Sequence, residues 1–235
     1  MFPEAAVARA NANVALVKYW GKRDPALNLP ATGSISLTLD GLAVEARVAF
    51  ASAASDRFVL DEAPARGEEA ARLARFFDLV REEAGRHERV DVVTRSAVPR
   101  GIGLASSAAA FAALALAGSR AAGLRLEPPA LSALARRGSG SAARSIFGGF
   151  VEWRAGKTHD ESHAVQIAPQ QSFDHFRHLA TALLVAALSP RVTLRRARGC
   201  IPQNAECNLG PSACPRISSY SIRATILTYA LDRRV

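Results

Sequence analysis

Cysteine and lysine are both scarce in this sequence, which has three of each among its 235 residues. The cysteines are Cys200, Cys207 and Cys214, so a disulfide framework is excluded from the first 190 residues. Paired zinc ligands commonly lie about two to four residues apart, whereas these cysteines are seven apart. No metal site is therefore predicted from side-chain ligands.

Long apolar runs are also missing. A membrane-spanning helix needs about 20 consecutive apolar residues, and stretches such as 108–117 are too short and too rich in alanine. The first residues have no basic segment followed by an apolar run, so no secretory signal is predicted. We therefore expect a cytoplasmic protein with no membrane partner.

Positive charge is concentrated near the end of the chain. The formal net charge is +9, but residues 191–235 hold eight arginines against two acids, Glu206 and Asp232, a net +6. The first 190 residues are left with +3. So small an excess does not favour a nucleic-acid surface, and no nucleic-acid partner is predicted.

Hydrophobic periodicity predicts a mixed α+β fold. The expected helices cover 68–84, 106–122 and a segment beginning at Pro128. The expected strands cover 34–39, 44–50, 57–61, 89–96, 148–153 and 164–168. Asp40-Gly41 is expected to form the turn of a hairpin between the first two strands. Residues 181–189 fit either a buried strand or a short helix.

The stretch PRGIGLASSAAA, from Pro99 to Ala110, places small residues immediately before a predicted helix. A helix N-terminus offers unpaired N–H groups and the positive end of a dipole, which together favour an anion such as phosphate. Gly101 and Gly103 allow close approach, and Ser106 and Ser107 add hydroxyl donors. The alternative is an alanine-rich helix packed tightly on a sheet, with the serines as ordinary caps.

A second cluster lies in RRGSGSAARSIFGGFVEW, residues 136–153. Ser139 is flanked by two glycines, and Arg144 follows Ser141 by three residues, so one turn of helix places both on the same face. Two hydroxyls and a guanidinium would form a second anion site. A Gly-Ser linker followed by a surface arginine is the alternative.

A third cluster is NANVALVKYWGKRD, residues 11–24. Two of the three lysines, Lys18 and Lys22, lie here in a chain that otherwise uses arginine. This choice indicates that the two positions require a compact point charge. Tyr19 and Trp20 can form the wall of a pocket and donate hydrogen bonds. The alternative is an aromatic strand end with solvated charges. Three anion-ready clusters indicate a polyphosphate ligand or two phosphorylated ligands.

Taken together and in this order, VKYWGKRD, GLASSAA and GSGSAARS resemble the diphosphomevalonate decarboxylases of the GHMP kinase superfamily. GLASSAA alone is typical of the whole superfamily, whereas the other two motifs are specific to the decarboxylases. The resemblance covers about residues 11–190. It implies an α+β domain like the second domain of ribosomal protein S5.

The resemblance also implies an activity and its ligands. The family phosphorylates the 3-hydroxyl of (R)-5-diphosphomevalonate from ATP, and phosphate then leaves as CO₂ is lost, giving isopentenyl diphosphate for isoprenoid biosynthesis. ATP and Mg²⁺ are the expected cofactors, and a homodimer is compatible with the family. The implied ATP-binding residues are Gly103, Leu104, Ala105, Ser106, Ser107 and Ala108. The implied substrate-binding residues are Tyr19, Trp20, Gly21, Lys22, Ser139, Gly140, Ser141, Ala142, Ala143 and Arg144.

The expected catalytic residues are Lys18, Ser141 and Arg144. Lys18 would lie near the reacting hydroxyl or the phosphates, and Arg144 would bind the carboxylate or stabilise developing charge. Two stretches depart from the family: Arg100-Gly101-Ile102 stands where Thr-Ala-Ala is usual, and 31–34 lacks the usual asparagine. Both departures could alter substrate contacts.

The resemblance ends abruptly at Pro190, where the composition also changes. We expect residues 1–190 to form the N-terminal ATP- and substrate-binding domain, and 191–235 to be a poorly ordered, divergent or frame-shifted tail. The family's DAGPN-like segment with its catalytic aspartate is missing, so this chain is expected to be weakly active or inactive. A frame shift and a divergent short paralogue are both open, as are a superfamily small-molecule kinase and a nucleotide-binding pseudoenzyme.

Overall fold

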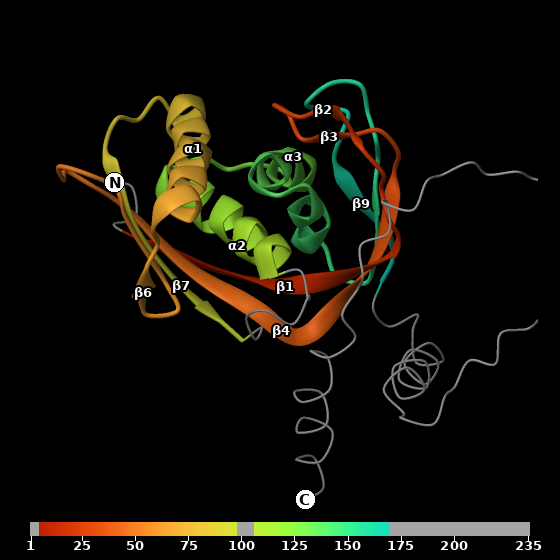
Figure 1. Cartoon of the computed structure of the whole chain (residues 1–235), viewed down its shortest axis with the longest axis horizontal. Coiled ribbons are helices and arrows are strands. Elements are labelled where there is room, and N and C mark those ends of the chain that lie inside the picture. The colour runs from red at the N-terminus through yellow and green to blue at the C-terminus, as the bar shows by residue number, and fades with distance from the viewer. Residues whose placement is uncertain (1–4, 98–105, 170–235) are drawn as a thin grey trace, which may run out of the picture. The chain divides into compact units, whose positions relative to one another are not determined.

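The computed structural model describes residues 5–97 and 106–169 of the chain. Three helices, α1 (Gly67–Ala84), α2 (Ser106–Ala121) and α3 (Pro128–Gly138), lie over one face of a sheet, as Figure 1 shows. A 3₁₀ helix, η1 (Gly140–Ile146), follows α3. The strands are β1 (Ala6–Val17), β2 (Lys22–Asp24), β3 (Leu29–Pro30), β4 (Ser34–Ala51), β5 (Arg57–Leu60), β6 (Ala63–Pro64), β7 (Arg89–Ser96), β8 (Phe150–Trp153) and β9 (Ala164–Ala168). This arrangement confirms the predicted α+β class.

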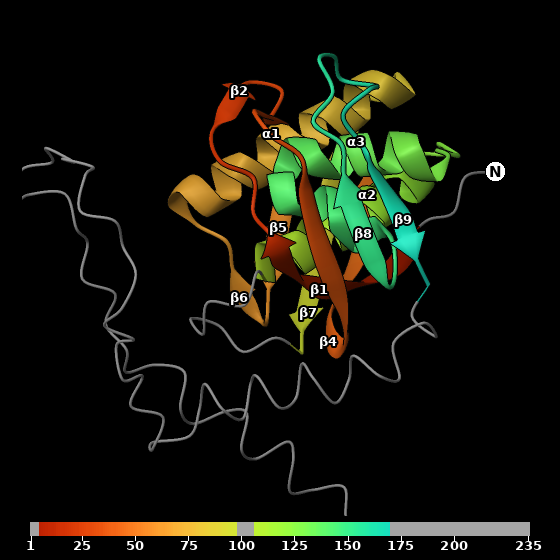
Figure 2. The same ribbon diagram turned by 90° about the vertical axis from the view of Figure 1, so that its right-hand side faces the viewer.

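The sheet is organised around β4, the longest of the described strands. The strand order is β6-β5-β7-β4-β8-β9, and β1 pairs antiparallel with β4 over most of its length. The two halves of β4 have different second neighbours: Val44–Ala51 pairs with β7, and Ser34–Leu37 pairs with β8. Figure 2 shows β8 and β9 side by side on the side turned toward the viewer, which is the right-hand side of Figure 1. β4 therefore links the two ends.

The predicted hairpin between 34–39 and 44–50 is wrong, because both segments belong to the single strand β4. Asp40-Gly41 forms an irregularity within the strand rather than a reversal of the chain. Gly41 has a φ of 80°, and its N–H donates to its neighbour Asp40 Oδ1 over 2.9 Å. On β1, Asn11 pairs with Ala43 of β4, and the next paired residue, Asn13, pairs with Thr38. This shift in register is the irregularity expected of a bulge.

The predicted helices are confirmed within one or two residues at their described ends, and so are the strands of β5, β7, β8 and β9. The prediction for 181–189 and those for the 191–235 tail lie outside the described residues. Among the helices of the described part, none is both long and apolar enough to cross a membrane.

Small residues on α2 bring it close to the sheet. Ala108, Ala109, Ala112, Ala113 and Ala115 are fully buried, so the alanine run serves packing against β1 and β4. The contact between α2 and α3 is equally close. A Cβ at Gly138 would lie 2.0 Å from the Phe111 ring, so only glycine fits there.

Arg136, fully buried at the end of α3, ties two loops together. Its Nε donates to the Leu27 carbonyl over 3.1 Å, and its Nη1 donates to the carbonyls of His159 and Ser162. Its Nη2 lies 2.9 Å from His159 Nδ1. Asn28 Nδ2 in turn donates to the carbonyls of Arg136 and Arg137. These contacts fix the β2–β3 segment, which carries Lys22, against α3.

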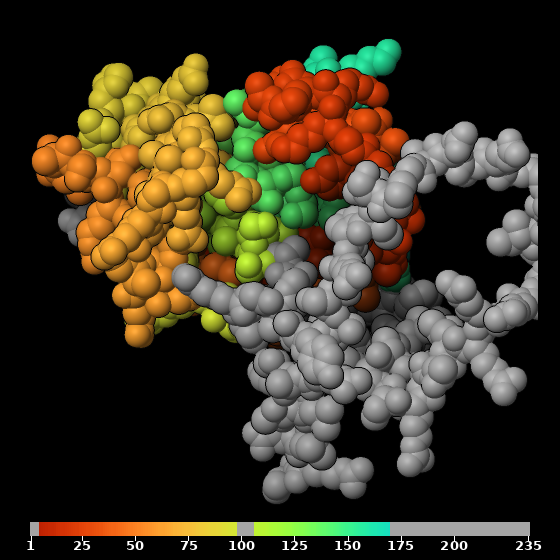
Figure 3. Space-filling model, in the orientation of Figure 1, coloured from red at the N-terminus to blue at the C-terminus, as the bar shows by residue number. Residues whose placement is uncertain are grey.

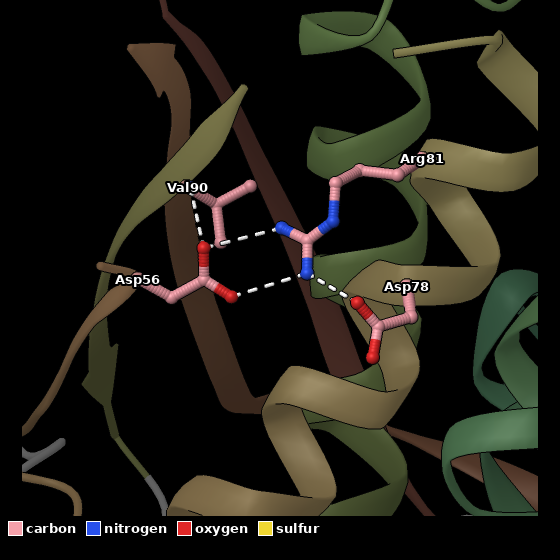
Figure 4. Close-up of polar contacts among 4 residues, drawn as sticks. All are labelled: Asp56, Asp78, Arg81 and Val90. Carbon is pink, nitrogen blue, oxygen red and sulfur yellow. Dashed lines mark hydrogen bonds and ion pairs between the residues drawn. The ribbon is translucent and has the colours of Figure 1, made fainter. Parts of the chain in front are cut away.

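At the other end of the sheet, Arg81 near the C-terminus of α1 forms an ion cluster with the nearly buried Asp56 and the exposed Asp78 (Figure 4). It contacts both carboxylate oxygens of Asp56, at 3.2 and 3.1 Å, and Asp78 Oδ1 at 2.5 Å. Asp56 Oδ1 also accepts the Val90 N–H over 3.0 Å. Although desolvation lowers the pKa of Arg81, the hydrogen bonds to Asp78 and Asp56 outweigh it, and the pKa is raised. The cluster fastens α1 to β7 and to the start of β5.

Candidate functional site

Arg144 lies on η1, which begins directly after the buried Ser139. Only 3% of Arg144 is exposed. Its Nη1 donates to Ser34 Oγ on β4 over 2.5 Å, and its Nη2 donates to Asn13 Oδ1 on β1 over 3.2 Å. Asn13 Nδ2 also donates to the Ser141 carbonyl and to Ser145 Oγ, at 3.1 and 2.8 Å. The amide of Asn13 therefore joins Arg144 to the backbone of η1.

The positive charge of Arg144 has no counterion in the part of the chain that the structure describes. Both side chains that accept its hydrogen bonds are neutral, and its buried Nε has no hydrogen-bond partner. Desolvation lowers the pKa of Arg144 to about 10, and Tyr19 partly opposes this shift. Burying an uncompensated charge is unfavourable, so the site suits an anion.

Tyr19 and Trp153 pack beside this arginine. Their rings meet edge to face with centroids 4.8 Å apart, and the Arg144 guanidinium carbon lies 5.8 Å from the Trp153 ring centroid. Trp153 is fully buried and donates from Nε1 to Ser162 Oγ. A Cβ at Gly140 would lie 3.0 Å from both the Tyr19 hydroxyl and the Trp153 ring. Glycine at 140 thus lets the tyrosine hydroxyl approach η1.

A cavity of about 700 Å³, which we call the basic cavity, opens beside η1. Four of its lining residues are basic and none is acidic. In Figure 3 the red segment around residues 19–30 and the orange-to-yellow α1 stand on either side of the green α3. The lining residues include Tyr19, Lys22, Asn28, Arg72, Arg75, Phe76, Arg137, Gly138, Ser139 and Gly140. Such a lining favours a ligand that carries several negative charges.

Two of the four basic residues come from α1. Arg72 Nε and Nη2 donate to the Gly138 carbonyl over 3.0 and 2.6 Å, and its guanidinium lies 4.6 Å from the Phe111 ring centroid. Desolvation, followed by the charge of Arg75, lowers the pKa of Arg72. Arg75 Nη2 lies 2.5 Å from Glu68 Oε1 in an exposed ion pair.

A second cavity of about 390 Å³, the α2 cavity, lies at the N-terminus of α2. Ser106 and Ser107 line it, and the first turn of α2 contains no acidic residue. Ser107 Oγ lies 3.3 Å from Ser139 Oγ, which lies 3.4 Å from Ser141 Oγ. A line of three hydroxyls therefore connects the N-terminus of α2 with η1.

The predicted site residues are only partly gathered. Tyr19, Lys22, Ser139 and Gly140 line the basic cavity, while Ser106 and Ser107 line the α2 cavity. Lys18 and Gly21 are exposed. Trp20 is 78% exposed, and its backbone N–H donates to Thr32 Oγ1. Ala108, Ala142 and Ala143 are fully buried in the core. Gly103, Leu104 and Ala105 lie outside the described residues.

Several residues of the site were missed from the sequence: Asn13, Ser34, Trp153 and the basic cavity's Arg72, Arg75 and Arg137. Arg72 and Arg75 lie outside the set of apolar residues that α1 buries, and solvated arginines occupy the same kind of position. A polar residue at an inward position of a strand was the available signal for Asn13 and Ser34. Both are at most 3% exposed, and buried polar groups in strands commonly hold a partner.

Comparison with known proteins points to one family. The family model for the diphosphomevalonate decarboxylase-like N-terminal domain matches residues 10–164. The diphosphomevalonate decarboxylase of Schizosaccharomyces pombe is 38% identical over 202 residues, which are 77% of this chain and 50% of that protein. The chain thus spans about half the length of the curated relatives it matches.

Solved structures agree with this match. One solved structure is described as showing the mevalonate diphosphate mediated ATP binding mechanism of the mevalonate diphosphate decarboxylase from Enterococcus faecalis. It is 43% identical with a TM-score of 0.68, over 70% of this chain and 51% of that one. A structure described as MDDEF in complex with MVAPP, AMPPCP and magnesium is also 43% identical. It has a TM-score of 0.67 over 70% of this chain and 50% of that one.

Proposed function

Because this chain belongs to the diphosphomevalonate decarboxylase-like N-terminal domain family, we propose that it binds mevalonate diphosphate and ATP. The reaction served is ATP-dependent decarboxylation of (R)-5-diphosphomevalonate to isopentenyl diphosphate, a step of isoprenoid biosynthesis. The curated relatives, about half of whose length this chain spans, support the proposal, as does a neighbour bound to MVAPP, AMPPCP and magnesium.

The observation that carries the proposal is the buried, uncompensated Arg144. The Nε of Arg144 is buried and Arg144 lines neither cavity, so a substrate carboxylate on the Tyr19 side of the basic cavity would supply the missing negative charge through space. Asn13 and Ser34 hold the other guanidinium nitrogens in place. An acidic substrate fits such a prepared cation, whereas a neutral substrate would leave the charge without a counterion.

The basic cavity suits the diphosphate group. Lys22, Arg72, Arg75 and Arg137 line it together with the Ser139 side chain, so cations and a hydroxyl donor surround one volume. Terminal phosphates carry several charges at neutral pH and prefer clusters of this kind. Arg144 lies close by through Tyr19, which lines the cavity and faces the same tryptophan.

The α2 cavity is the proposed place of ATP. Its serines lie in the first turn of α2, where N–H groups and the helix dipole favour phosphate oxygens. No group of three or more His, Cys, Asp or Glu side chains among residues 5–97 and 106–169 could hold a metal ion. Mg²⁺ would enter with the phosphates and neutralise part of their charge, and the side chains of Asp61, Glu68, Glu69, Ser106 and Ser107 bring oxygen atoms to the lining of this cavity.

In the proposed reaction the substrate's 3-hydroxyl oxygen attacks the γ-phosphorus of ATP and loses its proton to a general base, while the bond from that phosphorus to the bridging oxygen breaks and ADP leaves with the electron pair. The bond from C3 to that oxygen then breaks, and phosphate leaves with the electron pair. The bond between C1 and C2 breaks to release CO₂, and its electrons form the double bond of isopentenyl diphosphate. Arg144 would orient the carboxylate during this step, and Lys18 would serve the phosphates from its exposed position.

Isothermal calorimetry on the 235-residue protein tests the proposal. Mevalonate diphosphate should bind the unmodified protein, and Arg144→Gln should weaken that binding by roughly 1.5–3 kcal/mol, about one to two decades of affinity. ATP binding should be spared. Ser106→Ala serves as the matched control, with a small loss of ATP affinity and none for mevalonate diphosphate.

Unchanged diphosphate affinity in folded Arg144→Gln protein would contradict the site. If ATP binds and mevalonate diphosphate does not, a small-molecule kinase of the same superfamily, or a nucleotide-binding pseudoenzyme, becomes the better description. CO₂ release in the presence of both ligands then measures whether this chain turns over by itself.

A further inference from the structure

His159 occupies a junction between two loops that the proposed reaction does not use. It lies between β8 and β9 and is partly exposed, and its ring Nδ1 is 2.9 Å from Nη2 of the fully buried Arg136. An arginine side chain can only donate hydrogen bonds, so Nδ1 accepts and the neutral ring carries its proton on Nε2. This hydrogen bond therefore requires an uncharged His159.

Arg136 connects His159 to the β2–β3 segment, residues 22–30. Its Nε donates to the Leu27 carbonyl, and Asn28 Nδ2 donates to the Arg136 carbonyl. In the described part of the chain, β2 and β3 pair with each other in a sheet of two strands. Because an isolated pair of strands is marginally stable, the segment depends on α3 for its position.

The β2–β3 segment forms one side of the basic cavity. Lys22 and Asn28 line the cavity from this segment, and Arg137 and Gly138 line it from α3. The hydrogen bonds that hold the segment on α3 therefore also set the separation between Lys22 and Arg137. These are two of the cations that would face a bound anion.

Protonation of His159 is incompatible with this junction. A proton on Nδ1 would turn the acceptor into a donor and would place two cations 2.9 Å apart. It would also leave a donor of the buried Arg136 without its partner, which is costly.

The charged groups around the ring act mainly against protonation. Desolvation, then the charges of Arg136 and Arg137 on α3, lowers the pKa of His159, while Asp160 on the same loop opposes them. On β2, Asp24 acts on Arg136, whose pKa desolvation lowers to about 10. The neighbouring Arg23 donates to the Gly156 carbonyl of the His159 loop over 2.8 Å.

We propose that His159 makes anion binding in the basic cavity sensitive to pH: the neutral ring holds the β2–β3 segment in its binding position, and protonation loosens the segment and weakens binding. Leu29 and Pro30 of β3 are buried, so the segment stays attached in both states. The expected change in affinity is therefore only about threefold. The inference rests on the proposed function for the identity of the anion, mevalonate diphosphate.

Charge alone predicts the opposite direction. A protonated His159 would add positive charge near an anion, and a bound anion would in turn raise the pKa of the ring. If the junction controls the cavity, a bound anion instead favours the neutral ring, because coupling between two binding equilibria is reciprocal. The direction of the change in the His159 pKa on ligand binding therefore separates the two explanations.

An NMR titration of the histidine ring protons in the full 235-residue protein measures this direction. The titration is carried out with and without saturating mevalonate diphosphate, and His159→Asn, which removes one of the five histidines, assigns the resonance. His159→Gln gives the same assignment if the asparagine variant does not fold. The pKa of His159 should be lower in the complex. An unchanged or raised pKa overturns the inference.

Calorimetry at pH 7.5 and 5.0 measures the effect on affinity. The phosphates of the ligand titrate equally with every variant, so the quantity compared is the ratio of the two Kd values. His159→Asn keeps an acceptor for Arg136 and should lower this ratio about threefold. A merely structural role for His159 would change the Kd at both pH values and leave the ratio intact.

His163→Asn is the matched control. His163 lies on the same loop, but its Nδ1 is 2.8 Å from the Asp160 carbonyl rather than at the junction. The variant should keep the ratio of the unmodified protein. Circular dichroism at both pH values shows whether each protein is folded.

The outcomes separate the two proposals. If the unmodified, folded protein does not bind mevalonate diphosphate at pH 7.5, the proposed function fails. If it binds, but the ratio is the same in folded His159→Asn protein, the inference is overturned and the proposed function stands. A ratio that falls with His159→Asn and persists with His163→Asn supports the inference.

Discussion

Arg81 and Arg144 are both nearly buried, and they lie toward opposite ends of β4. Arg81 belongs to the end where Phe50 pairs with Val90, and Arg144 to the end where Ser34 pairs with Trp153. Arg81 has two carboxylates as partners, and its pKa is raised. Arg144 has two neutral partners and an unpaired Nε, and its pKa falls to about 10.

The difference teaches how to tell a structural buried charge from one prepared for a ligand. A charge that is compensated within the domain leaves nothing for a ligand to supply. Arg136 gives an intermediate case: its pKa also falls to about 10 by desolvation, yet carbonyls and His159 occupy its nitrogens. Neutral partners thus suffice for a structural arginine when each donor nitrogen has one.

The largest effect should follow from removing the compensated charge. Arg81→Met leaves Asp56 buried without its cation, and the free energy of unfolding should fall by about 3–5 kcal/mol. Urea denaturation followed by circular dichroism measures it. The double variant with Asp56→Asn, which keeps an acceptor for the Val90 N–H, should recover part of the loss. A loss below about 1 kcal/mol would remove the distinction between the two arginines.

The uncompensated charge should behave in the opposite way. Arg144→Met should change the stability of the ligand-free protein by less than about 1 kcal/mol or increase it, because an unpaired buried charge is removed. Mevalonate diphosphate at 100 times its Kd should stabilise the unmodified protein by about 2.7 kcal/mol. The same concentration should stabilise Arg144→Met far less. Thermal melts with and without ligand report both quantities, and equal ligand-induced shifts would contradict the prediction.

Supplying Arg144 with an internal counterion should make it resemble Arg81. Asn13→Asp places a carboxylate at the atom that now accepts from Nη2, so the site should lose about tenfold in affinity for mevalonate diphosphate, or about 1.4 kcal/mol. Ser34→Ala removes the other acceptor without adding charge and should have a smaller effect. Competition calorimetry ranks the two variants. The reverse ranking would show that geometry rather than charge controls affinity.

The smallest effect concerns His159, whose ring contacts Arg136. Desolvation, then the charges of Arg136 and Arg137, lowers the pKa of His159, and Asp160 opposes them. A lowered folded-state pKa means that the stabilisation is present above the unfolded value of about 6.5 and is lost as the pH falls through the folded value. His159→Asn keeps an acceptor and should remove this pH dependence, which amounts to less than about 1 kcal/mol. Urea midpoints at pH 7.5 and 5.5 compare the variant with the unmodified protein.

Local periodicity predicted most of the elements but not how they join. The apolar spacing of α1 and the alternation of β7 reflect burial of one face, which a sequence displays directly. Asp40-Gly41 misled because the same dipeptide suits a hairpin turn and a bulge. Only the pairing of β1 with both halves of β4 decides between them, and that pairing is a tertiary property.

The candidate site was predictable only where a motif carries it. Ser139, Gly140 and Arg144 lie in one short stretch, so their proximity is local. Arg72, which also lines the basic cavity, comes from α1. Ser34, which accepts a hydrogen bond from Arg144, comes from β4. Nothing in the local pattern around Arg72 distinguishes a cavity-lining arginine from a solvated one. The fold brings such residues together, and sequence neighbours do not reveal it.

The division of β4 between two partners has a consequence for synthesis on the ribosome. A chain emerges N-terminus first, so β1, the C-terminal half of β4 and β7 can pair before α2 is made. The N-terminal half of β4 waits for β8, and its unpaired edge is meanwhile open to other chains. Trp153 and η1 also arrive late. The end of the domain that holds Arg81 should therefore fold first, and the ligand-binding end should be the last part to mature.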